Sequence, residues 1–503
     1  MEMPAKNTVE EVIYAPDETG AGMEAWNILN ETVAVRRAEG SAIGEIPRGI
    51  AWFFGAEELM QGEERDVIFR INDRNLPCTL RSDGTDGRLR ICGDMPEEMG
   101  VSQDTVFTKI ARGVFEVDFR NGEETDPVRE TLCQISRRIT AKGFTYPAGL
   151  VENFYLSLKS KPFVLLAGTS GTGKTRFARL FAEAVGATAE NGRYLLVPVR
   201  PDWSDPTDLL GRTDINGRFV PGVLLDFLKA AEAEPDRPYF LCLDEMNLAR
   251  VEYYFSDFLS ALETREHKGD RIVTDALLSR SDYGADREAA EKYGNVYWSD
   301  NLYIIGTVNM DESTFPFSRR VLDRANTVEF SSVRLNVLPP VRGEEPAVIP
   351  VENGFLKAPY LFLQDCLSEE ARFQSLCDKL EALNAILERG GAAVGYRVRD
   401  EIVFYLLNNK KHGLLSEEEA FDNAMMQKLL PHVEGSGAAV GRMLEGLFNF
   451  AAGEYRGAEG KSKSEEMEYF LEKKNPGKYP KSAKKILNMM RRWEEDGFTS
   501  FWL

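Results

Sequence analysis

The sequence predicts an α/β protein whose centre is a parallel sheet covered by helices on both faces. Three observations support this fold class. Between about residues 163 and 330, short apolar segments alternate with helical ones, as in a parallel sheet with crossover helices. A glycine-rich loop, GTSGTGKT, follows the first apolar segment and precedes a helical one. The flanks differ from this core, because residues 64–120 hold short strand-like runs and residues 358–455 are typical of helices.

The length of 503 residues corresponds to roughly three domains. The polar stretch NGEETD resembles a linker before the core, and the Pro-rich connector LPPVRGEEPAVIP follows it. We therefore predict four segments. They are a β-rich N-terminal module (1–125), an α/β nucleotide-binding core (126–335), a helical region (336–455), and a C-terminal amphipathic helix packed on that region (456–503).

Composition restricts the partners and the compartment. The net charge of −20 argues against a general basic surface that coats nucleic acid, although it leaves room for a local basic patch. No apolar stretch approaches the ~18 residues that span a bilayer, and the N-terminus lacks a secretion signal. The six cysteines form no C-x-x-C pair, which argues against a zinc site or a disulfide framework. We expect a cytoplasmic protein without a membrane contact.

The N-terminal module is predicted to be a small barrel or sheet, because Gly- and Asp-rich turns such as SDGTDG separate its strand-like runs. Arginine on a β surface suits contacts with phosphates and base edges. The interleaved aspartates suit a solvated face instead, so DNA reading, protein docking and a purely structural role all stay open. The arginines concerned are Arg70, Arg74, Arg81, Arg88 and Arg90, and the aspartates are Asp73, Asp83 and Asp86.

The glycine-rich loop has the pattern G-x-x-x-x-G-K-[ST] between a strand and a helix, the context in which this pattern binds phosphate. Glycines let backbone N–H groups turn toward a phosphate chain, and the helix N-terminus adds its positive end. Lys174 is expected to reach the β- and γ-phosphates, and Thr175 to ligate Mg²⁺. The loop comprises Gly168, Thr169, Ser170, Gly171, Thr172, Gly173, Lys174 and Thr175.

An acidic pair, Asp244 and Glu245, ends the apolar run YFLCLDE. In parallel sheets, the carboxyl ends of the strands form the edge where ligands bind. Asp244 is expected to be a partner of Mg²⁺, and Glu245 the base that orients and activates the attacking water. Such a pair can also be a helix N-cap with a charged first turn. Its position after a phosphate loop favours the catalytic interpretation.

The next apolar run, LYIIGTVN, ends in Asn309. If this run is a strand of the same sheet, Asn309 lies at the edge that already holds Lys174 and Glu245. An amide there can hold the attacking water or contact the γ-phosphate. The alternative is an Asn that closes a turn through its own backbone. Asp311 is a further candidate, either as a helix cap or as a residue that orders Asn309.

The order of these motifs resembles the AAA+ ATPase superfamily. More closely, MNLARVEYYFSDFLSALE and GTVNMDESTFPFSRRVLDRANTVEF resemble the McrB-type branch, the motor subunits of modification-dependent (type IV) restriction systems. The resemblance covers roughly residues 140–455 and the C-terminal GFTSFW. It implies an AAA+ P-loop core with helices on both faces of its sheet, an α-helical lid at 336–455, and a small β-rich N-terminal domain.

The resemblance also implies an arginine that completes the site of a neighbouring subunit. The candidates are Arg319, Arg320 and Arg324, and Arg324 is preferred because it directly precedes the last strand. The alternative is a surface arginine paired with Asp323, since surface ion pairs are common and contribute little.

In the helical region, the segment GYRVRDEIVFYLL resembles the one that carries the lid arginine. Arg397 is therefore the candidate that touches phosphate within its own subunit, with Arg399 as the second choice.

The choice of nucleotide stays open between GTP and ATP. The best-known McrB-type members place an acid three residues after the tip asparagine, whereas this chain reads Asn309-Met310-Asp311-Glu312. That element accompanies the GTP preference of the family, so the preference is not carried over. The chain also lacks an N-K-x-D guanine reader.

The resemblance implies a homo-oligomeric ring, a hexamer, that hydrolyses GTP or ATP with Mg²⁺. Such a ring would drive an McrC-like nuclease subunit in DNA restriction and phage defence, with possible DNA contact through the N-terminal module. The alternative is an AAA+ remodelling or chaperone-like ATPase that acts on protein. An insertion-like stretch, residues 267–295, is either a pore- or partner-facing element or a surface excursion.

Overall fold

The computed structural model describes two compact units, Met1–Pro127 and Val128–Leu503. Before residue 126 it describes eight strands together with residues 54, 56, 59 and 63. From residue 126 onward it describes 126–310, 315–330, 346–453, 462–474 and 477–502. Among these residues, no helix is both long enough and apolar enough to cross a membrane.

The first unit is the predicted β-rich domain, and its strands form one sheet in the order β1-β2-β7-β8-β4-β5-β6-β3. Neighbouring strands are antiparallel except β4 and β8, which run parallel. Phe54, Phe69, Phe107 and Phe115 pack together in its core and are fully or almost fully buried. The strands are β1 (Glu11–Tyr14), β2 (Thr32–Arg36), β3 (Glu45–Ile46), β4 (Glu64–Ile71), β5 (Arg74–Ser82), β6 (Leu89–Cys92), β7 (Asp104–Ala111) and β8 (Val114–Arg120).

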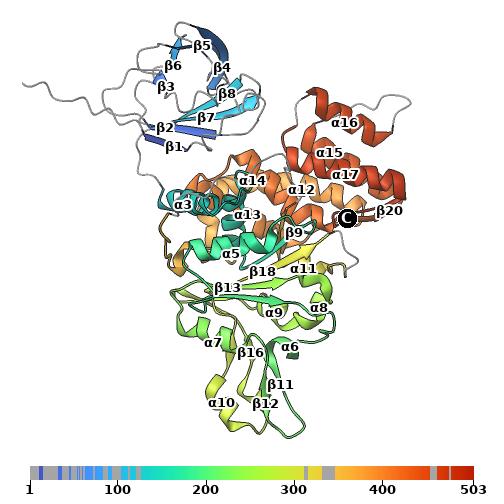
Figure 1. Cartoon of the computed structure of the whole chain (residues 1–503). Coiled ribbons are helices and arrows are strands. Elements are labelled where there is room, and N and C mark those ends of the chain that lie inside the picture. The colour runs from blue at the N-terminus through green and yellow to red at the C-terminus, as the bar shows by residue number, and fades with distance from the viewer. Residues whose placement is uncertain are drawn as a thin grey trace, which may run out of the picture. The chain divides into compact units, whose positions relative to one another are not determined.

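The second unit contains the predicted parallel sheet, with strand order β10-β13-β18-β9-β19 (Figure 1). All four pairings are parallel, which confirms the fold class. Every residue of β9 and β18 is buried, because both faces of these central strands are covered. The strands are β9 (Phe163–Gly168), β10 (Tyr194–Pro198), β13 (Tyr239–Asp244), β18 (Leu302–Asn309) and β19 (Asn326–Glu329).

Alternate residues of β9 belong to two different apolar cores. Val164 and Leu166 pack in a core that includes α4, α5 and helices of the lid. Phe163 and Leu165 pack in a second core that includes α7, α8 and α9. Helices therefore cover both faces of the sheet, as the alternation of strands requires. The helices of the core are α3 (Pro127–Ala141), α4 (Leu150–Ser160), α5 (Lys174–Ala184), α6 (Thr207–Leu210), α7 (Leu225–Ala233), η2 (Met246–Leu248), α8 (Val251–Tyr254), α9 (Ser256–Ala261) and α11 (Arg319–Leu322).

The insertion-like stretch folds into small elements beside a hairpin of the core (Figure 1). Tyr283 of the insertion packs on Phe219 of the hairpin, with ring centroids 4.8 Å apart. Whether this part faces a pore or a partner stays a prediction. Its elements are β14 (Glu266–Lys268), β15 (Arg271–Val273), β16 (Ala276–Leu278), η3 (Arg280–Tyr283), α10 (Arg287–Tyr293) and β17 (Val296–Tyr297), and the hairpin is β11 (Gly211–Thr213) with β12 (Phe219–Pro221).

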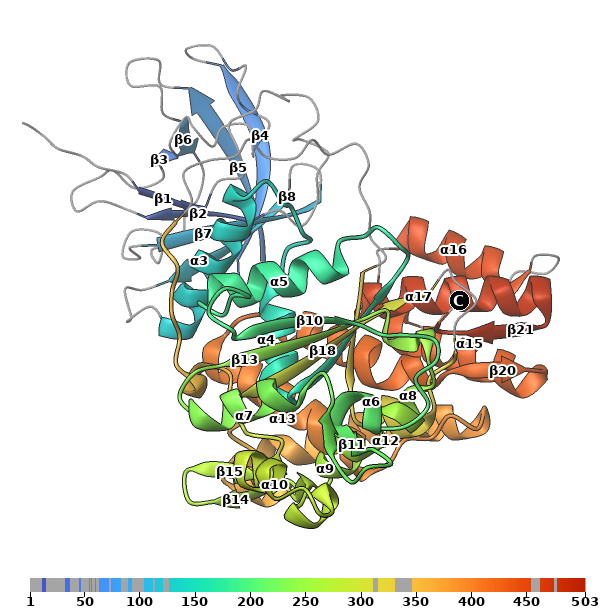
Figure 2. The same cartoon turned by 60° about the horizontal axis from the view of Figure 1, so that its bottom comes forward.

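The residues after the core form the helical lid and the C-terminal segment. The described residues of the latter include the helices α16 and α17, and α17 packs with α15 in the same core (Figure 2). The elements are η4 (Asn353–Phe355), η5 (Leu363–Glu369), α12 (Glu370–Arg389), α13 (Tyr396–His412), α14 (Glu417–Ala424), η6 (Met425–Leu429), η7 (Leu430–His432), β20 (Glu434–Ser436), α15 (Ala438–Ala452), α16 (Lys463–Lys474), α17 (Pro480–Asp496) and β21 (Phe498–Ser500).

Candidate functional site

The glycine-rich loop connects β9 to α5, and its three glycines are required for two different reasons. Gly171 and Gly173 have φ angles of 80° and 88°, in the left-handed region that side chains disfavour. Gly168 is restricted by space instead, because a Cβ there would lie 2.6 Å from the carbonyl oxygen of Phe330. The loop is thus shaped by backbone conformation at its tip and by close packing at its base.

Lys174 is the first residue of α5, and its side chain is buried. Its Nζ donates hydrogen bonds to the carbonyl oxygens of Gly168 at 2.9 Å and Thr169 at 2.6 Å. The ammonium group therefore lies along the loop. The hydroxyl of Tyr146 donates to the carbonyl oxygen of Gly173 at 3.2 Å, and burial raises the pKa of this tyrosine to about 12.

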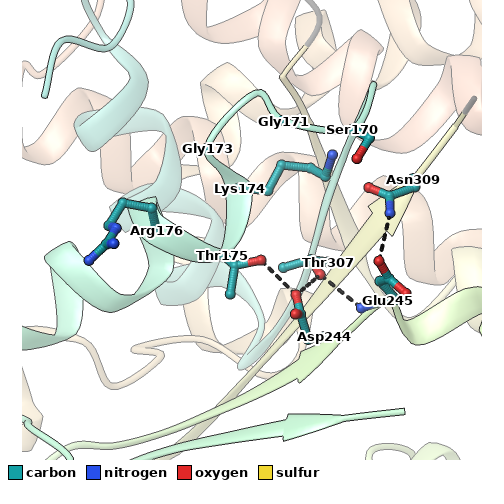
Figure 3. A pocket seen from close by; sticks show the side chains of 10 residues that line it. All are labelled: Ser170, Gly171, Gly173, Lys174, Thr175, Arg176, Asp244, Glu245, Thr307 and Asn309. Carbon is teal, nitrogen blue, oxygen red and sulfur yellow. Dashed lines mark hydrogen bonds between the residues drawn. The ribbon is translucent and has the colours of Figure 1, made fainter. Parts of the chain in front are cut away.

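Asp244 lies at the carboxyl end of β13, where two hydroxyl groups converge on it (Figure 3). Its Oδ1 accepts hydrogen bonds from Thr175 Oγ1 at 2.6 Å and from Thr307 Oγ1 at 2.7 Å. The Thr307 hydroxyl also accepts a bond from the backbone N–H of Glu245 at 3.0 Å. Thr307 thus joins both members of the acidic pair to β18.

Sequence analysis did not identify Thr307. Thr307 lies two positions before Asn309 in the apolar run LYIIGTVN. A β-branched residue is ordinary inside a strand, so it does not stand out there. The signal available was a polar side chain in an otherwise apolar run, one residue beyond Gly306, which pairs with Leu243 of the acidic strand.

Glu245 has a φ angle of 53°, and among the described residues it is the one non-glycine residue with a positive φ. A left-handed backbone at such a residue costs on the order of 1–3 kcal/mol and often marks a functional site. Asn309 Nδ2 donates to Glu245 Oε1 at 3.2 Å (Figure 3). Asn247 donates in turn to the carbonyl oxygen of Asn309 at 3.2 Å. The strand tip, the turn and the glutamate are therefore held in one arrangement.

These residues line one pocket, which includes most of the predicted loop residues, the acidic pair and Asn309. Sequence analysis did not predict Arg176 and Thr307, which also line it. Arg176 lies over the ring of Phe144, with its Cζ 5.4 Å from the centroid. The lining residues are Ser170, Gly171, Gly173, Lys174, Thr175, Arg176, Asp244, Glu245, Thr307 and Asn309.

The donors in this pocket fit Mg²⁺. The Thr175 hydroxyl and the Asp244 carboxylate are hard oxygen donors that already lie 2.6 Å apart. The described residues contain no cluster of three or more His, Cys, Asp or Glu that could hold a metal alone. Mg²⁺ in nucleotide sites uses one or two protein oxygens and completes its octahedron with phosphates and waters. A site with two protein oxygens beside a phosphate loop matches this preference.

The candidate arginines after β18 lie outside the pocket lining. Arg324 forms an ion pair with Glu263, just beyond α9, and donates to the carbonyl oxygen of Arg320 at 2.6 Å. Its partner is therefore not the Asp323 carboxylate that the sequence suggested. Arg319 donates to the carbonyl oxygen of Gly391 at 2.5 Å.

The predicted lid arginine, Arg397, also lies outside the pocket lining. Its Nη2 is 2.8 Å from Glu263 Oε1, so Arg324 and Arg397 share one carboxylate. Burial, together with the Arg397 charge, lowers the pKa of Arg324. The second candidate, Arg399, pairs with Asp400 at 2.7 Å. Asp311 falls outside the described residues, as does Glu312.

Two of the five arginines predicted to face DNA have described side chains. Arg81 and Arg90 are both exposed, and they lie opposite each other on β5 and β6. Arg81 Nε is 3.8 Å from the carboxylate of Glu64 on β4. The side chains of Arg70, Arg74 and Arg88 lie outside the described residues. A role in DNA contact stays a prediction.

Two family models match the chain. Residues 163–325, which span β9 to the residue before β19, match the AAA domain (dynein-related subfamily). Residues 338–498, which contain the lid helices and α17, match a domain of unknown function, DUF8727. The first match contains the loop, the acidic pair and Asn309, so the pocket lies within an AAA domain.

The chain is also similar to the type IV methyl-directed restriction enzyme EcoKMcrB subunit of Escherichia coli (strain K12). The two are 22% identical over 321 residues, which make up 60% of this chain and 63% of that relative. Residues 163–325 are thus an AAA domain, in a chain that is similar to an McrB subunit over 60% of its length. An AAA domain is a P-loop nucleoside triphosphatase domain, and the chain spans 63% of the length of this relative.

Three solved structures share some likeness with this chain. A candidate ATPase from Cytophaga hutchinsonii is 13% identical, with a TM-score of 0.37 over 61% of this chain and 87% of that one. A full-length MCM homologue from Methanopyrus kandleri is 14% identical, with a TM-score of 0.30 over 72% and 74%. NtrX from Brucella abortus is 17% identical, with a TM-score of 0.23 over 44% and 47%. Scores this low carry no argument about this chain.

Proposed function

We propose that this chain hydrolyses the β–γ phosphoanhydride bond of GTP or ATP, in a Mg²⁺-dependent reaction within a homo-oligomeric ring. One observation carries the proposal. Within a single pocket, the loop lysine, a threonine–aspartate oxygen pair and a glutamate bonded to a strand-tip asparagine lie together. Phosphoryl transfer needs mainly positioning and charge stabilisation, and these are the groups that provide both.

The proposed roles follow from chemistry and position. The loop N–H groups and Lys174 bind the phosphate chain. Thr175 and Asp244 hold Mg²⁺, which when bound neutralises phosphate charge. Glu245 accepts a proton from the attacking water, whose oxygen bonds to the γ-phosphorus. The bond from that phosphorus to the bridging oxygen breaks, which leaves a nucleoside diphosphate and phosphate. Asn309 orients the Glu245 carboxylate through its amide.

The arginines supply the proposed link between subunits. Arg324 lies outside its own pocket lining, which fits a side chain that completes the pocket of a neighbour. Arg319 and Arg320 are the other candidates for this trans contact, and Arg397 is proposed to contact phosphate in its own subunit. Because a trans arginine requires a neighbour for every site, a closed ring such as a hexamer satisfies all subunits equally.

The partner is proposed from the McrB-type likeness. We expect the ring to energise an McrC-like nuclease in DNA restriction and phage defence, with the N-terminal module as a possible DNA contact. Nuclease activity that appears only when such a partner subunit is added supports this role. Nucleotide-dependent release of a bound protein, without any effect on DNA, would instead indicate a remodelling ATPase.

The central test is Glu245→Gln, which keeps the shape of the side chain and removes the base. The variant is expected to bind nucleotide and assemble, with turnover reduced by about 10²-fold or more, since a positioned base contributes roughly 10²–10⁴-fold. The matched control is Glu266→Gln, an exposed glutamate on β14 outside the pocket lining, which should retain normal turnover. Near-normal turnover in Glu245→Gln would refute the mechanism.

A second experiment addresses the open choices of nucleotide and assembly. Turnover of GTP is compared with that of ATP, with and without modified DNA, beside the mass of the oligomer. Turnover that rises with protein concentration in parallel with the oligomer mass supports a site shared between subunits. Equal turnover in monomer and oligomer would contradict the trans contribution of Arg324.

A further inference from the structure

The lid contains a π-helix, η6. Two adjacent residues within it, Gln427 and Lys428, are both buried. Such π turns are rare and often occur at functional sites. Gln427 binds α4, because its Oε1 accepts a hydrogen bond from Ser157 Oγ at 2.9 Å and its amide contacts Asn153. The π-helix is therefore anchored to the core immediately beside Lys428.

Lys428 holds the backbone on both sides of Arg324. Its Nζ donates to the carbonyl oxygen of Ala325 at 2.7 Å and lies 3.4 Å from that of Asp323. The side chain is only 2% exposed, so water offers little competition for these contacts. One ammonium group of the lid thus contacts the backbone on both sides of Arg324, the residue predicted to complete the pocket of a neighbouring subunit.

The charge of Lys428 is balanced inside the protein by Glu401 of α13. Glu401 Oε2 lies 2.7 Å from Lys428 Nζ, and Glu401 Oε1 lies 2.5 Å from Nζ of Lys161, which precedes β9. The two lysines hold the pKa of Glu401 below its usual range, although burial alone would raise it. Because an unpaired buried charge is costly, the three side chains form one unit that spans lid and core.

Arg324 is thereby held from two directions. Glu263 of the core pairs with its guanidinium, whereas Lys428 of the lid binds the backbone that carries it. We propose that Lys428 is a positioning residue that sets the place of Arg324 according to the position of the lid. The lid of one subunit then controls hydrolysis in the pocket of the next. This inference rests on the proposed trans role of Arg324.

The first test uses two substitutions that disturb the same ion group. Lys428→Met removes the contacts with the carbonyl oxygens of Asp323 and Ala325. Lys161→Met removes the other lysine paired with Glu401, and Lys161 lies outside residues 323–325. Misplacement of a catalytic group by about 1 Å can cost 10²-fold. Lys428→Met is expected to lower kcat by 10-fold or more with little change in KM. Lys161→Met is expected to change kcat by no more than about twofold.

The second test shows whose pocket is affected. In rings mixed from Lys428→Met and Glu245→Gln subunits, an intact pocket of the former can meet an intact Arg324 of the latter. Turnover of the mixture is expected to exceed the sum of the two separate preparations several-fold. A mixture no faster than that sum, or an equal loss of kcat in Lys161→Met, overturns the inference.

A parallel mixture separates failure of this inference from failure of the proposed function. Arg324→Ala subunits mixed with Glu245→Gln subunits must recover turnover if Arg324 acts in trans. If turnover recovers in the Arg324→Ala mixture but not in the Lys428→Met mixture, the positioning role of Lys428 is rejected and the trans role of Arg324 stands. If neither mixture recovers, the trans role itself is wrong. Should Lys428→Met fail to assemble, Lys428→Gln, which keeps an amide donor for the carbonyls, is expected to show a smaller loss and the same rescue.

Discussion

The nucleotide pocket and the arginine pair at Glu263 differ in how far one chain completes them. In the pocket, the hydroxyls of Thr175 and Thr307 already donate hydrogen bonds to Asp244. At Glu263, by contrast, Arg324 and Arg397 pair with an exposed carboxylate of the same chain, outside the residues that line the pocket. We propose that the pocket binds the nucleotide of its own subunit, whereas Arg324 acts in the pocket of a neighbouring subunit. The difference divides the proposed reaction between subunits.

The largest expected effect comes from the arginine region. Arg324→Ala should lower kcat by about 10³-fold or more while nucleotide affinity stays within a few-fold, since a trans arginine acts mainly on the transition state. Turnover and equilibrium nucleotide binding are measured on the same preparation. Arg320→Ala is measured beside it, because Arg320 is another candidate for the trans contact and its backbone carbonyl accepts a hydrogen bond from Arg324. A large loss of kcat in Arg320→Ala and none in Arg324→Ala would assign the trans role to Arg320 instead.

A smaller effect is expected inside the pocket at Thr307. Thr307→Val keeps the shape but removes the hydroxyl that donates to Asp244 and accepts from the Glu245 backbone. Residues that orient metal ligands typically contribute about 10–100-fold to metal affinity or activity. We expect a loss of that size, with a raised Mg²⁺ requirement in turnover assays. Thr307→Ser should restore most of the activity, and an unchanged Mg²⁺ dependence in Thr307→Val would contradict the role.

Two loop glycines are expected to affect the stability of the fold for different physical reasons. Gly168→Ala places a methyl group against the backbone of Phe330 and should lower the free energy of unfolding by about 1–3 kcal/mol. Gly171→Ala meets no neighbouring atom but must adopt a φ near 80°, which costs roughly 1–2 kcal/mol. Denaturant unfolding measures both changes. A Gly168→Ala variant as stable as the wild type would show that the loop base can relax.

The sequence predicted the pocket well because its groups follow a local rule. Asp244 and Asn309 end apolar strands, Lys174 follows the loop after another, and parallel strands bring their carboxyl ends to one edge. Thr307 was not predicted because it lies two residues before the end of its strand, where a β-branched residue is ordinary.

The contacts around the arginines could not be predicted in the same way. Glu263 follows α9 and Lys428 lies in η6, and no periodicity links either of them to Arg324. A lysine or glutamate in a helical segment is normally solvated, yet Lys428 and Glu401 are buried as a pair. Such pairing depends on how the lid packs on the core. The pairing is therefore seen only in the three-dimensional structure.

The smallest expected effect is a pH dependence confined to the arginine region. His432 of η7 is 2% exposed, and its Nε2 lies 3.6 Å from Asp323 Oδ1, one residue before Arg324. Burial, reinforced by the charges of Lys428 and Arg319, lowers the pKa of His432 to about 3. The unfolded chain therefore binds a proton near the ordinary histidine pKa of about 6.5, whereas the folded chain does not.

Stability should consequently decline as the pH falls below about 6.5, with a slope from this residue of up to about 1.4 kcal/mol per pH unit. His432→Asn removes the titrating group, so the drop in Tm between pH 7 and pH 5 should be smaller in this variant than in the wild type. His412→Asn, at the end of α13, serves as the control and should keep the wild-type drop. Equal drops in His432→Asn and the wild type would mean that the protonated imidazole is tolerated beside Arg324, and that the lid opens there more readily than its burial implies.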